Sequence, residues 1–248
     1  KLAFYVFFYT IHDIIFSLHT MQQLLEKYHI ELSEEELEKF QKFLEIFMEK
    51  NSQINLSAIR DKDEIIEKHF IDSLMLGAFY DIEGKVADLG TGGGFPGIPL
   101  AIVSPDTEFT LIDSVAKKLK CIDSFVDELW LLNVDTLCWR AEEIGQDTDH
   151  RESFDLVVSR ATAYFPTLLE YTLPLLKVWW VFAAYKLTDK EELSSTKKAL
   201  SRLGGKIMKV KNYDIAEQER SIVFIEKIST TPSKYPRKVG IPLKEPIK

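Results

Sequence analysis

One glycine-rich segment restricts the fold of this chain more than any other feature. Residues 88–97 read DLGTGGGFPG; they begin within the short apolar stretch VADL (86–89) and lead into a helix predicted at 97–103. Glycine tolerates positive φ and lets a ligand approach the backbone closely. A strand that ends in such a loop and continues into a helix is typical of nucleotide-type cofactor sites in open α/β sheets.

The chain after Gly84 alternates between short apolar strands and helices. The predicted strands are VADLG, FTLID, DTLCW and FDLVVS, and the predicted helices span 97–103, 116–131 and 166–176. Such alternation predicts an α/β fold with a parallel sheet and helices on both faces. Two later apolar runs, 178–186 and 221–228, are predicted to form a terminal antiparallel pair of strands.

The residues before this core are predicted to form a helical cap. Apolar side chains recur at helical spacing from Met21, and Ser33 with Glu36 forms a capping box that starts a second helix. A third helix is predicted at about 62–79. The expected organisation is therefore an extension of unknown role (1–20), a helical cap (21–80), a cofactor-binding core (81–230) and a tail (231–248).

The two ends of the chain have unusual compositions. Residues 1–20 are rich in aromatics, but His12 and Asp13 interrupt them and the stretch is too short to span a bilayer. The last 17 residues hold four prolines and five basic residues against one acidic residue. Proline excludes a core helix or strand. The tail is expected either to pack on the core as an extended strap or to contact RNA.

Charge and cysteine usage limit the class of function. A net charge of −8 argues against non-specific coating of nucleic acid, so any RNA contact must be local. Cys121 and Cys138 show no pairing or metal-ligand spacing, so we expect free buried thiols in a reducing compartment. The five histidines are scattered, and we expect no metal site.

The loop satisfies two cofactor patterns. G-x-G-x-x-G begins at Gly92 and indicates a dinucleotide, whereas D-x-G-x-G-x-G begins at Asp88 and indicates S-adenosylmethionine. Pro96 lacks the N–H that a pyrophosphate would use at the helix start. Asp88 adds a carboxylate near the expected place of a cationic methionine moiety. The second pattern fits better.

Three later strands end in polar residues that suit the same site. Asp113 ends the second strand, where a carboxylate can accept both ribose hydroxyls. Ala141 and Glu142 follow the third strand and could read an adenine edge, although a capping role for the acid is the alternative. Arg160 follows the fourth strand and is expected to face the crevice where such sheets bind ligands.

At this point the chain resembles the RsmG family, also called glucose-inhibited division protein B, which methylates guanine N7 in 16S ribosomal RNA. The matching stretches are Asn55-Leu56-Ser57, His69-Phe70-Ile71-Asp72-Ser73, DLGTGGGFPGIPLAI, Thr110-Leu111-Ile112-Asp113-Ser114, Arg140-Ala141-Glu142-Glu143, Ser159-Arg160-Ala161 and Lys234-Tyr235-Pro236-Arg237-Lys238. They occur in family order and cover essentially everything after Met21.

The resemblance implies a Rossmann-like class I methyltransferase sheet, S-adenosylmethionine as cofactor, and 16S ribosomal RNA or the small ribosomal subunit as partner. It also implies a cytoplasmic monomer without metal or membrane. Cofactor contacts are expected from Asp88, Gly90, Gly92, Phe95, Asp113, Ala141, Glu142 and Arg160. Substrate contacts are expected from His69, Asp72, Ser73 and Arg237, and catalytic roles from Arg160 and Lys186.

Several positions depart from the family pattern. Where the family tends to have glycine, this chain has Trp130, Trp139, Trp179, Trp180 and Leu187. Glycine at helix ends and hairpins commonly takes φ > 0, which tryptophan adopts at a cost of about 1 kcal/mol or more. Local strain is therefore expected around Glu142, Lys186 and a hairpin at 179–180.

The chemistry that the resemblance implies needs no general base. Guanine N7 has a free lone pair, so it can attack a sulfonium methyl directly, and catalysis rests on in-line positioning. Arg160 and Lys186 are the candidates for holding the base or its phosphate. Two alternative functions remain: a nicotinamide-dependent oxidoreductase and a non-catalytic RNA-binding protein of ribosome assembly.

Overall fold

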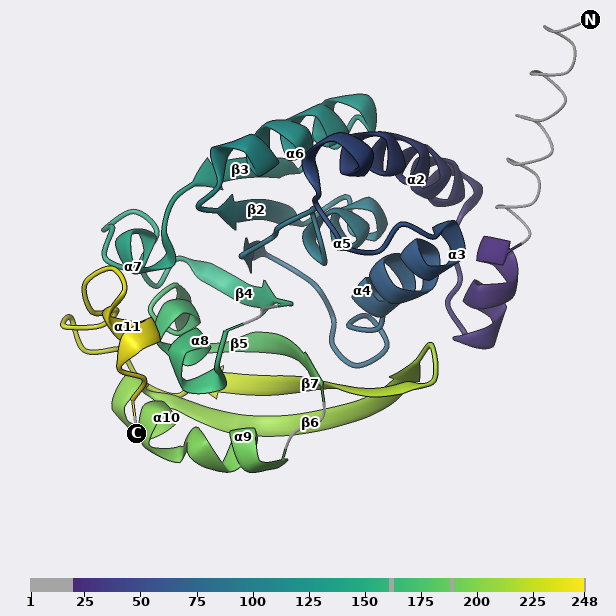
Figure 1. Cartoon of the computed structure of the whole chain (residues 1–248). Helices are drawn as coiled ribbons and strands as arrows, with labels where there is room; N and C mark the ends of the chain where they lie inside the picture. Colours follow the sequence, from purple (N-terminus) through teal and green to yellow (C-terminus); the bar gives the residue numbers. More distant parts are fainter. Residues whose placement is uncertain (1–19, 161–162, 188–189, 248) are drawn as a thin grey trace, which may run out of the picture.

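A seven-stranded sheet forms the centre of the computed structural model, which describes residues 20–160, 163–187 and 190–247 (Figure 1). The predicted extension 1–20 lies outside the described residues, except for residue 20. The strands are β1 (Lys85–Leu89), β2 (Glu108–Asp113), β3 (Val134–Cys138), β4 (Phe154–Ser159), β5 (Leu176–Leu187), β6 (Gly205–Ile215) and β7 (Gln218–Lys227). Their order is β3-β2-β1-β4-β5-β7-β6, and the five earlier strands pair in parallel. The predicted α/β class is confirmed.

Helices cover both faces of the sheet, as predicted. They are α2 (Glu34–Ile54), α3 (Lys62–Ile65), η1 (Ile66–Ile71), α4 (Asp72–Leu74), α5 (Gly97–Val103), α6 (Ala116–Glu128), α7 (Ala141–Ile144), α8 (Phe165–Thr172), α9 (Lys190–Ser195), α10 (Lys197–Leu203) and α11 (Ile241–Lys244). Successive residues of β1 alternate between the two layers. Val86 belongs to the hydrophobic cluster that includes side chains of α2, α5 and α6, whereas Ala87 belongs to a second cluster that includes side chains of α8 and α10.

The helical cap shares its hydrophobic core with the sheet. Phe43 of α2 stacks on Phe70 with ring centroids 5.2 Å apart, and lies 5.5 Å from both Phe95 and Phe125. Phe95 belongs to the glycine-rich loop and Phe125 to α6. The capping box at Ser33 and Glu36 is confirmed and fixes where α2 begins. Because the aromatic rings interlock, the cap positions the loop directly.

The helix predicted at 62–79 contains a π-helical segment. The α-helical turn α3 is followed by η1 and then by the short α4. Such segments are frequent at functional sites, because the wider turn changes the direction of side chains. His69 lies in η1 and Asp72 opens α4, and both contact the side chain of Arg160, which follows β4.

The predicted terminal pair exists, but the sheet has one more strand. β5 pairs antiparallel with β7, for example Phe182 with Ile225. β6 then pairs with β7 at the edge of the sheet. Its sequence GKIMKVKNYDI buries few side chains, because every second residue from Lys206 to Asp214 lies on an exposed face. The apolar runs that predicted the other strands are therefore missing from β6.

The C-terminal tail packs on the core, which is one of the two alternatives for these residues. Tyr235 and Ile247 are buried. Arg151 donates to the carbonyl oxygens of Thr231 and Tyr235, each at 2.7 Å. Figure 1 shows this segment in yellow beside α7 and α8. Lys248 lies outside the described residues.

Two expectations about single residues are corrected. Cys121 is buried as predicted, but Cys138 is exposed because it ends the edge strand β3. The hairpin expected at 179–180 is wrong: Trp179 and Trp180 lie within β5. The pairing of β5 with β4 is irregular there.

The strain expected at glycine-type positions is confirmed for two tryptophans. Trp130 has φ 53° and Trp179 has φ 74°, and their side chains are 81% and 70% exposed. Trp139 and Trp180 are absent from the positive-φ residues of the described chain, and both pack against the core. Leu187 ends β5 and is exposed.

Candidate functional site

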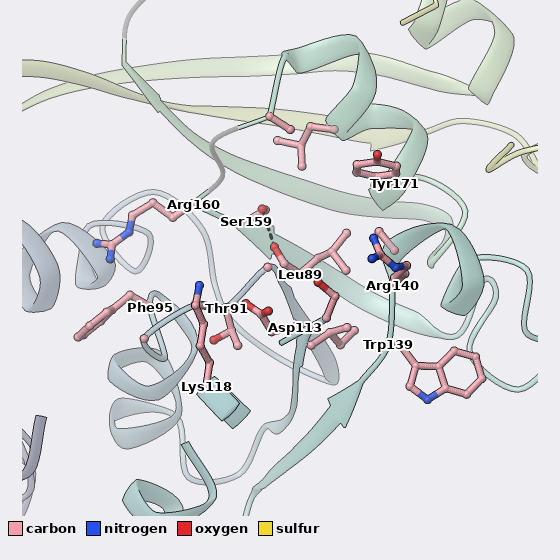
Figure 2. A pocket seen from close by; sticks show the side chains of 18 of the residues that line it. Leu89, Thr91, Phe95, Asp113, Lys118, Trp139, Arg140, Ser159, Arg160 and Tyr171 are labelled. Carbon is pink, nitrogen blue, oxygen red and sulfur yellow. Dashed lines mark hydrogen bonds between the residues drawn. The ribbon is translucent and has the colours of Figure 1, made fainter. Parts of the chain in front are cut away.

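A cleft of about 520 Å³ opens at the carboxyl ends of β1, β2, β3 and β4 (Figure 2). In this view Phe95 and Arg160 lie on one side, Thr91 and Asp113 near the middle, and Tyr171 on the other side. The cleft thus lies where the strand connections change direction, the usual ligand position in open α/β sheets. Its lining includes Ser57, His69, Gly90, Gly92, Phe95, Asp113, Lys118, Trp139, Arg140, Ala141, Glu142, Arg160, Tyr171, Gly240 and Leu243.

The glycine-rich loop presents its backbone to this cleft. Gly90, Gly92 and Gly94 have φ of 77°, 61° and 93°. A Cβ added to Gly90 would meet no heavy atom within 4 Å, so open space borders the chain there. At Gly94 an added Cβ would come within 2.5 Å of Ile98. The first glycine therefore leaves room for a ligand, and the third allows close packing of α5.

Asp88 supports the loop from beneath. It is fully buried, and its Oδ2 accepts a hydrogen bond from Gly97 N at 2.9 Å. Oδ1 is buried without a hydrogen-bond partner among the described residues. Burial raises the pKa of this carboxyl to about 6. Asp88 is not among the residues that line the cleft, so the cofactor contact expected from it stays a prediction.

Asp113 is held in place by two backbone amides. Its Oδ2 accepts from Gly92 N at 3.1 Å and its Oδ1 from Val115 N at 2.9 Å. The residue ends β2, lines the cleft and keeps 9% of its surface exposed. Each carboxylate oxygen has a second lone pair, so the fixed group can still accept hydroxyl donors from the cleft.

Glu142 joins three parts of the chain at the far end of the cleft. Its Oε1 accepts from the Tyr171 hydroxyl at 3.2 Å and from Gly240 N at 2.9 Å. Burial, together with this carboxylate, raises the pKa of Tyr171 well above its ordinary value. Ala141 lines the cleft beside it. The carboxylate therefore ties the tail to α7 and α8, a contact that the sequence did not predict.

Arg160 lies between the cap and the loop. Its Nη2 donates to His69 Nδ1 at 3.0 Å, and its guanidinium stands 5.1 Å above the Phe95 ring. Arginine has only donors, so Nδ1 must be the acceptor and the neutral ring carries its proton on Nε2. That nitrogen lies 2.7 Å from Ser57 Oγ. Burial and the Arg160 charge lower the pKa of His69 to about 3.

Asp72 anchors two arginines in a buried network. Its Oδ2 accepts from Arg220 Nη1 at 2.8 Å and from Arg160 Nη1 at 3.3 Å. Its Oδ1 accepts from the Tyr213 hydroxyl at 2.9 Å. Ser73 is also buried, donates to His69 O at 2.6 Å and lines neither of the clefts described here.

A second cleft, of about 480 Å³, lies on the other side of Arg160. Asp72, Lys186 and Arg220 are among its lining residues, and Arg160 lines both clefts. Lys186 Nζ donates to Glu192 Oε1 at 2.8 Å. The structure thus brings the two predicted catalytic residues together at the second cleft, and of the two only Arg160 also borders the main cleft.

Arg237 lies away from both clefts. Its Nη2 donates to Glu170 Oε2 at 2.7 Å and to Glu245 O at 2.7 Å. The side chain of Glu170 is fully buried, so the guanidinium neutralises an internal charge. The substrate contact expected from Arg237 stays a prediction, and its observed role is to fasten the tail.

Sequence reasoning missed several residues at the site. Ser57 and Tyr171 line the main cleft, and Arg220 lines the second. Gly240 and Leu243 reach the cleft from the tail. Ser57 belongs to Asn55-Leu56-Ser57, one of the stretches that match the family, and could have been found from it. A lone tyrosine or leucine in an amphipathic segment gives no indication of a binding site.

The described residues include no helix with the length and apolar character needed to cross a bilayer. Their His, Cys, Asp and Glu side chains form no group of three or more suited to a metal ion.

Two solved structures share the architecture of much of this chain. M. jannaschii TYW2 in complex with AdoMet gives a TM-score of 0.51 at 19% identity, covering 64% of this chain and 76% of that one. NSun6 from Pyrococcus horikoshii with SFG gives 0.52 at 14% identity, covering 64% and 51%. At these identities the likeness establishes the Rossmann-like fold.

Sequence relatives are much closer. Ribosomal RNA small subunit methyltransferase G of Desulfitobacterium hafniense is 46% identical over 226 residues, covering 90% of this chain and 94% of the relative. The protein of that name from Geobacillus sp. is 42% identical over 234 residues, covering 92% and 97%. The sequence model of the GidB family, rRNA small subunit methyltransferase G, matches residues 36–223. This chain therefore belongs to the rRNA small subunit methyltransferase G family.

Proposed function

We propose that this chain transfers a methyl group from S-adenosylmethionine to N7 of a guanine in 16S ribosomal RNA. The observation that carries the proposal is the position of Arg160, which lines both the cleft at the glycine-rich loop and a second cleft that holds two further cationic side chains. A methyl donor and an acceptor base need two adjoining sites. The proposal places the enzyme in the cytoplasm as a monomer, acting on the RNA or on the small ribosomal subunit.

The residues of the main cleft suit S-adenosylmethionine. The open space beside Gly90 admits a ligand against the backbone, and Asp113 offers a fixed carboxylate to ribose hydroxyls. Pro96 offers no N–H to a pyrophosphate. Ala141 and Glu142 stand at the end where the adenine would lie. The cofactor would supply a methyl group made electrophilic by a positively charged sulfur.

The second cleft suits a guanine nucleotide. Guanine presents acceptors at O6 and N7, and its phosphate is anionic. The cleft is lined by three basic side chains, Arg160, Lys186 and Arg220, and by their two acidic partners, Asp72 and Glu192. Arg220 Nε is a buried donor without a partner among the described residues. A base can enter such a pocket only after it leaves its stack. The acidic chain as a whole then needs only this local contact with RNA.

The chain's own residues act by positioning. N7 has a free lone pair, so no side chain has to remove a proton before the methyl group is transferred. His69 and Asp72 fix the Arg160 guanidinium from two sides, and Phe95 supports it from below. A donor that is already oriented costs no reorganisation during the reaction. Arg160 and Lys186 would hold the base or its phosphate in line with the methyl group.

The test compares Lys186→Ala with Lys177→Ala, because both lysines lie on β5. Lys177 pairs with Asp155 and lines neither cleft. We expect Lys186→Ala to lower kcat at least about tenfold with unchanged cofactor affinity, and Lys177→Ala to behave like wild type. Titration of the wild type with S-adenosylmethionine and with NAD distinguishes the alternatives. Binding of NAD alone favours an oxidoreductase, and RNA binding without either cofactor favours a non-catalytic assembly protein.

A further inference from the structure

The tail reaches the cofactor cleft, although it follows the other lining residues by many positions in the sequence. Gly240 and Leu243 line the cleft together with Ala141, Glu142 and Tyr171. We propose that the tail forms one wall of the cofactor site and that the Leu243 side chain packs against the base of the bound nucleoside. This inference rests on the proposed function, since it assumes that an adenine nucleoside fills the cleft.

Contacts on both sides of Leu243 hold this wall in place. On the N-terminal side, Arg237 forms an ion pair with the buried carboxylate of Glu170, at 2.7 Å. Directly before Leu243, the carbonyl oxygen of Pro242 accepts a hydrogen bond from the buried Thr167 hydroxyl at 2.9 Å. On the C-terminal side, Ile247 is buried in the core. The backbone at Leu243 is therefore fixed by α8 and by the core.

Glu142 connects this wall to Tyr171, which also lines the cleft. Its Oε1 accepts from Gly240 N on the tail and from the Tyr171 hydroxyl on α8. Gly240 has φ 80°, a conformation that favours glycine and that turns the chain into α11. One carboxylate thus sets the positions of both the tail and Tyr171 around the same end of the cleft.

Leu243 is 65% exposed, although Pro242 before it and Ile247 after it are buried. An exposed leucine is common by itself, but this one borders a cleft and is held by an anchored backbone. The faces of a purine are flat and apolar, and ligand clefts are lined mainly by apolar side chains. A base in this end of the cleft would cover the leucine and exclude water from it.

Val239 provides a matched control. It is an exposed apolar residue of the same tail, 45% exposed, and does not line the cleft. Its truncation to alanine removes a similar side chain without altering the proposed wall. Both substitutions are at exposed positions, so both variants should fold, and melting curves check this.

The experiment titrates the full chain and its Leu243→Ala, Leu243→Met and Val239→Ala variants calorimetrically. The ligands are S-adenosylhomocysteine and 5′-methylthioadenosine, which share the adenosine part but differ in the amino-acid part. We expect Leu243→Ala to weaken both ligands by the same factor, about five- to twentyfold. Leu243→Met should restore most of the affinity, and Val239→Ala should bind like wild type.

Three results would overturn the inference. In the first, Leu243→Ala binds both ligands as tightly as wild type. In the second, it weakens S-adenosylhomocysteine alone, which would place the leucine at the amino-acid end. In the third, Val239→Ala weakens binding equally, which would indicate a general effect of the tail. Failure of the wild type to bind S-adenosylhomocysteine would instead contradict the proposed function.

Discussion

Arg160 donates a hydrogen bond to Nδ1 of His69 across 3.0 Å, and this contact links the strand β4 to the π-helical segment of the cap. It requires a neutral imidazole, because a protonated ring would present a donor to a donor. Ser57 stands at the other ring nitrogen. The cap therefore orients the arginine that separates the two clefts.

The first prediction concerns the pH dependence of stability through His69. Its pKa is lowered to about 3 in the folded chain, against about 6.5 when unfolded. Between these values the unfolded chain binds the extra proton, so stability falls as the pH drops below 6.5. Between pH 7.5 and 5.5 the free energy of unfolding of the wild type should fall by on the order of 1 kcal/mol more than that of His69→Asn. The asparagine keeps an acceptor for Arg160. Denaturant unfolding at pH 7.5 and 5.5 measures this, and equal losses would refute it.

The second prediction concerns Asp113. Asp113→Asn keeps one carbonyl oxygen for the backbone but loses the charge that strengthens hydrogen bonds to ribose hydroxyls. The binding free energy of S-adenosylmethionine should weaken by about 1.5–3 kcal/mol. Asp135→Asn is the control, because Asp135 lies on the adjacent strand β3 and is exposed. Equal affinity of the Asp113 variant and wild type in calorimetry would remove this residue from the site.

The sequence was sufficient to predict the parts of the site that depend on local patterns. The glycine-rich loop, the position of Asp113 at the end of β2 and that of Arg160 after β4 all follow from the alternation of strands and glycines. The carboxyl ends of parallel strands meet at one edge of the sheet, so these residues had to converge. The capping box at Ser33 is local in the same sense.

The remaining features depend on contacts between distant residues. The link from Glu142 to Gly240 spans 98 positions, and nothing near either residue predicts it. The π-helical turn around His69 lies where the cap packs on the loop, with the rings of His69 and Phe95 stacked 4.6 Å apart, and local propensity does not predict it. Strand β6 depends on pairing with β7, and its exposed face lacks the apolar run that identifies buried strands.

The third prediction separates two adjacent tryptophans. Trp179 has φ 74° and is 70% exposed, so glycine should relieve strain with little loss of burial. Trp179→Gly should raise the free energy of unfolding by about 0.5–1 kcal/mol. Trp180 packs against the core, so Trp180→Gly should lower the free energy of unfolding by about 1 kcal/mol or more. Thermal melts of both single variants check this, and a lower melting temperature for Trp179→Gly would show that its indole is packed.

The fourth prediction concerns the ion pair between Arg237 and Glu170. Removing the guanidinium in Arg237→Ala leaves a buried carboxylate without its charge partner, which should destabilise the chain by about 3 kcal/mol. Adding Glu170→Gln should recover part of that loss. Because the guanidinium is already paired, the dependence of RNA affinity on salt should not change. If Arg237→Ala instead flattened the slope of log RNA affinity against log salt concentration by about 0.7–0.9 and left stability unaltered, Arg237 would be assigned to an RNA phosphate.

The most direct test of the proposed function is transfer of labelled methyl groups from S-adenosylmethionine to small-subunit ribosomal RNA, offered both free and as the subunit particle. After nuclease digestion, the nucleosides are separated and identified by mass spectrometry. We predict that the label appears in 7-methylguanosine, and that Arg160→Ala abolishes it while the variant still melts cooperatively. Label in any other nucleoside, or none with either form of the RNA, would contradict the proposed reaction.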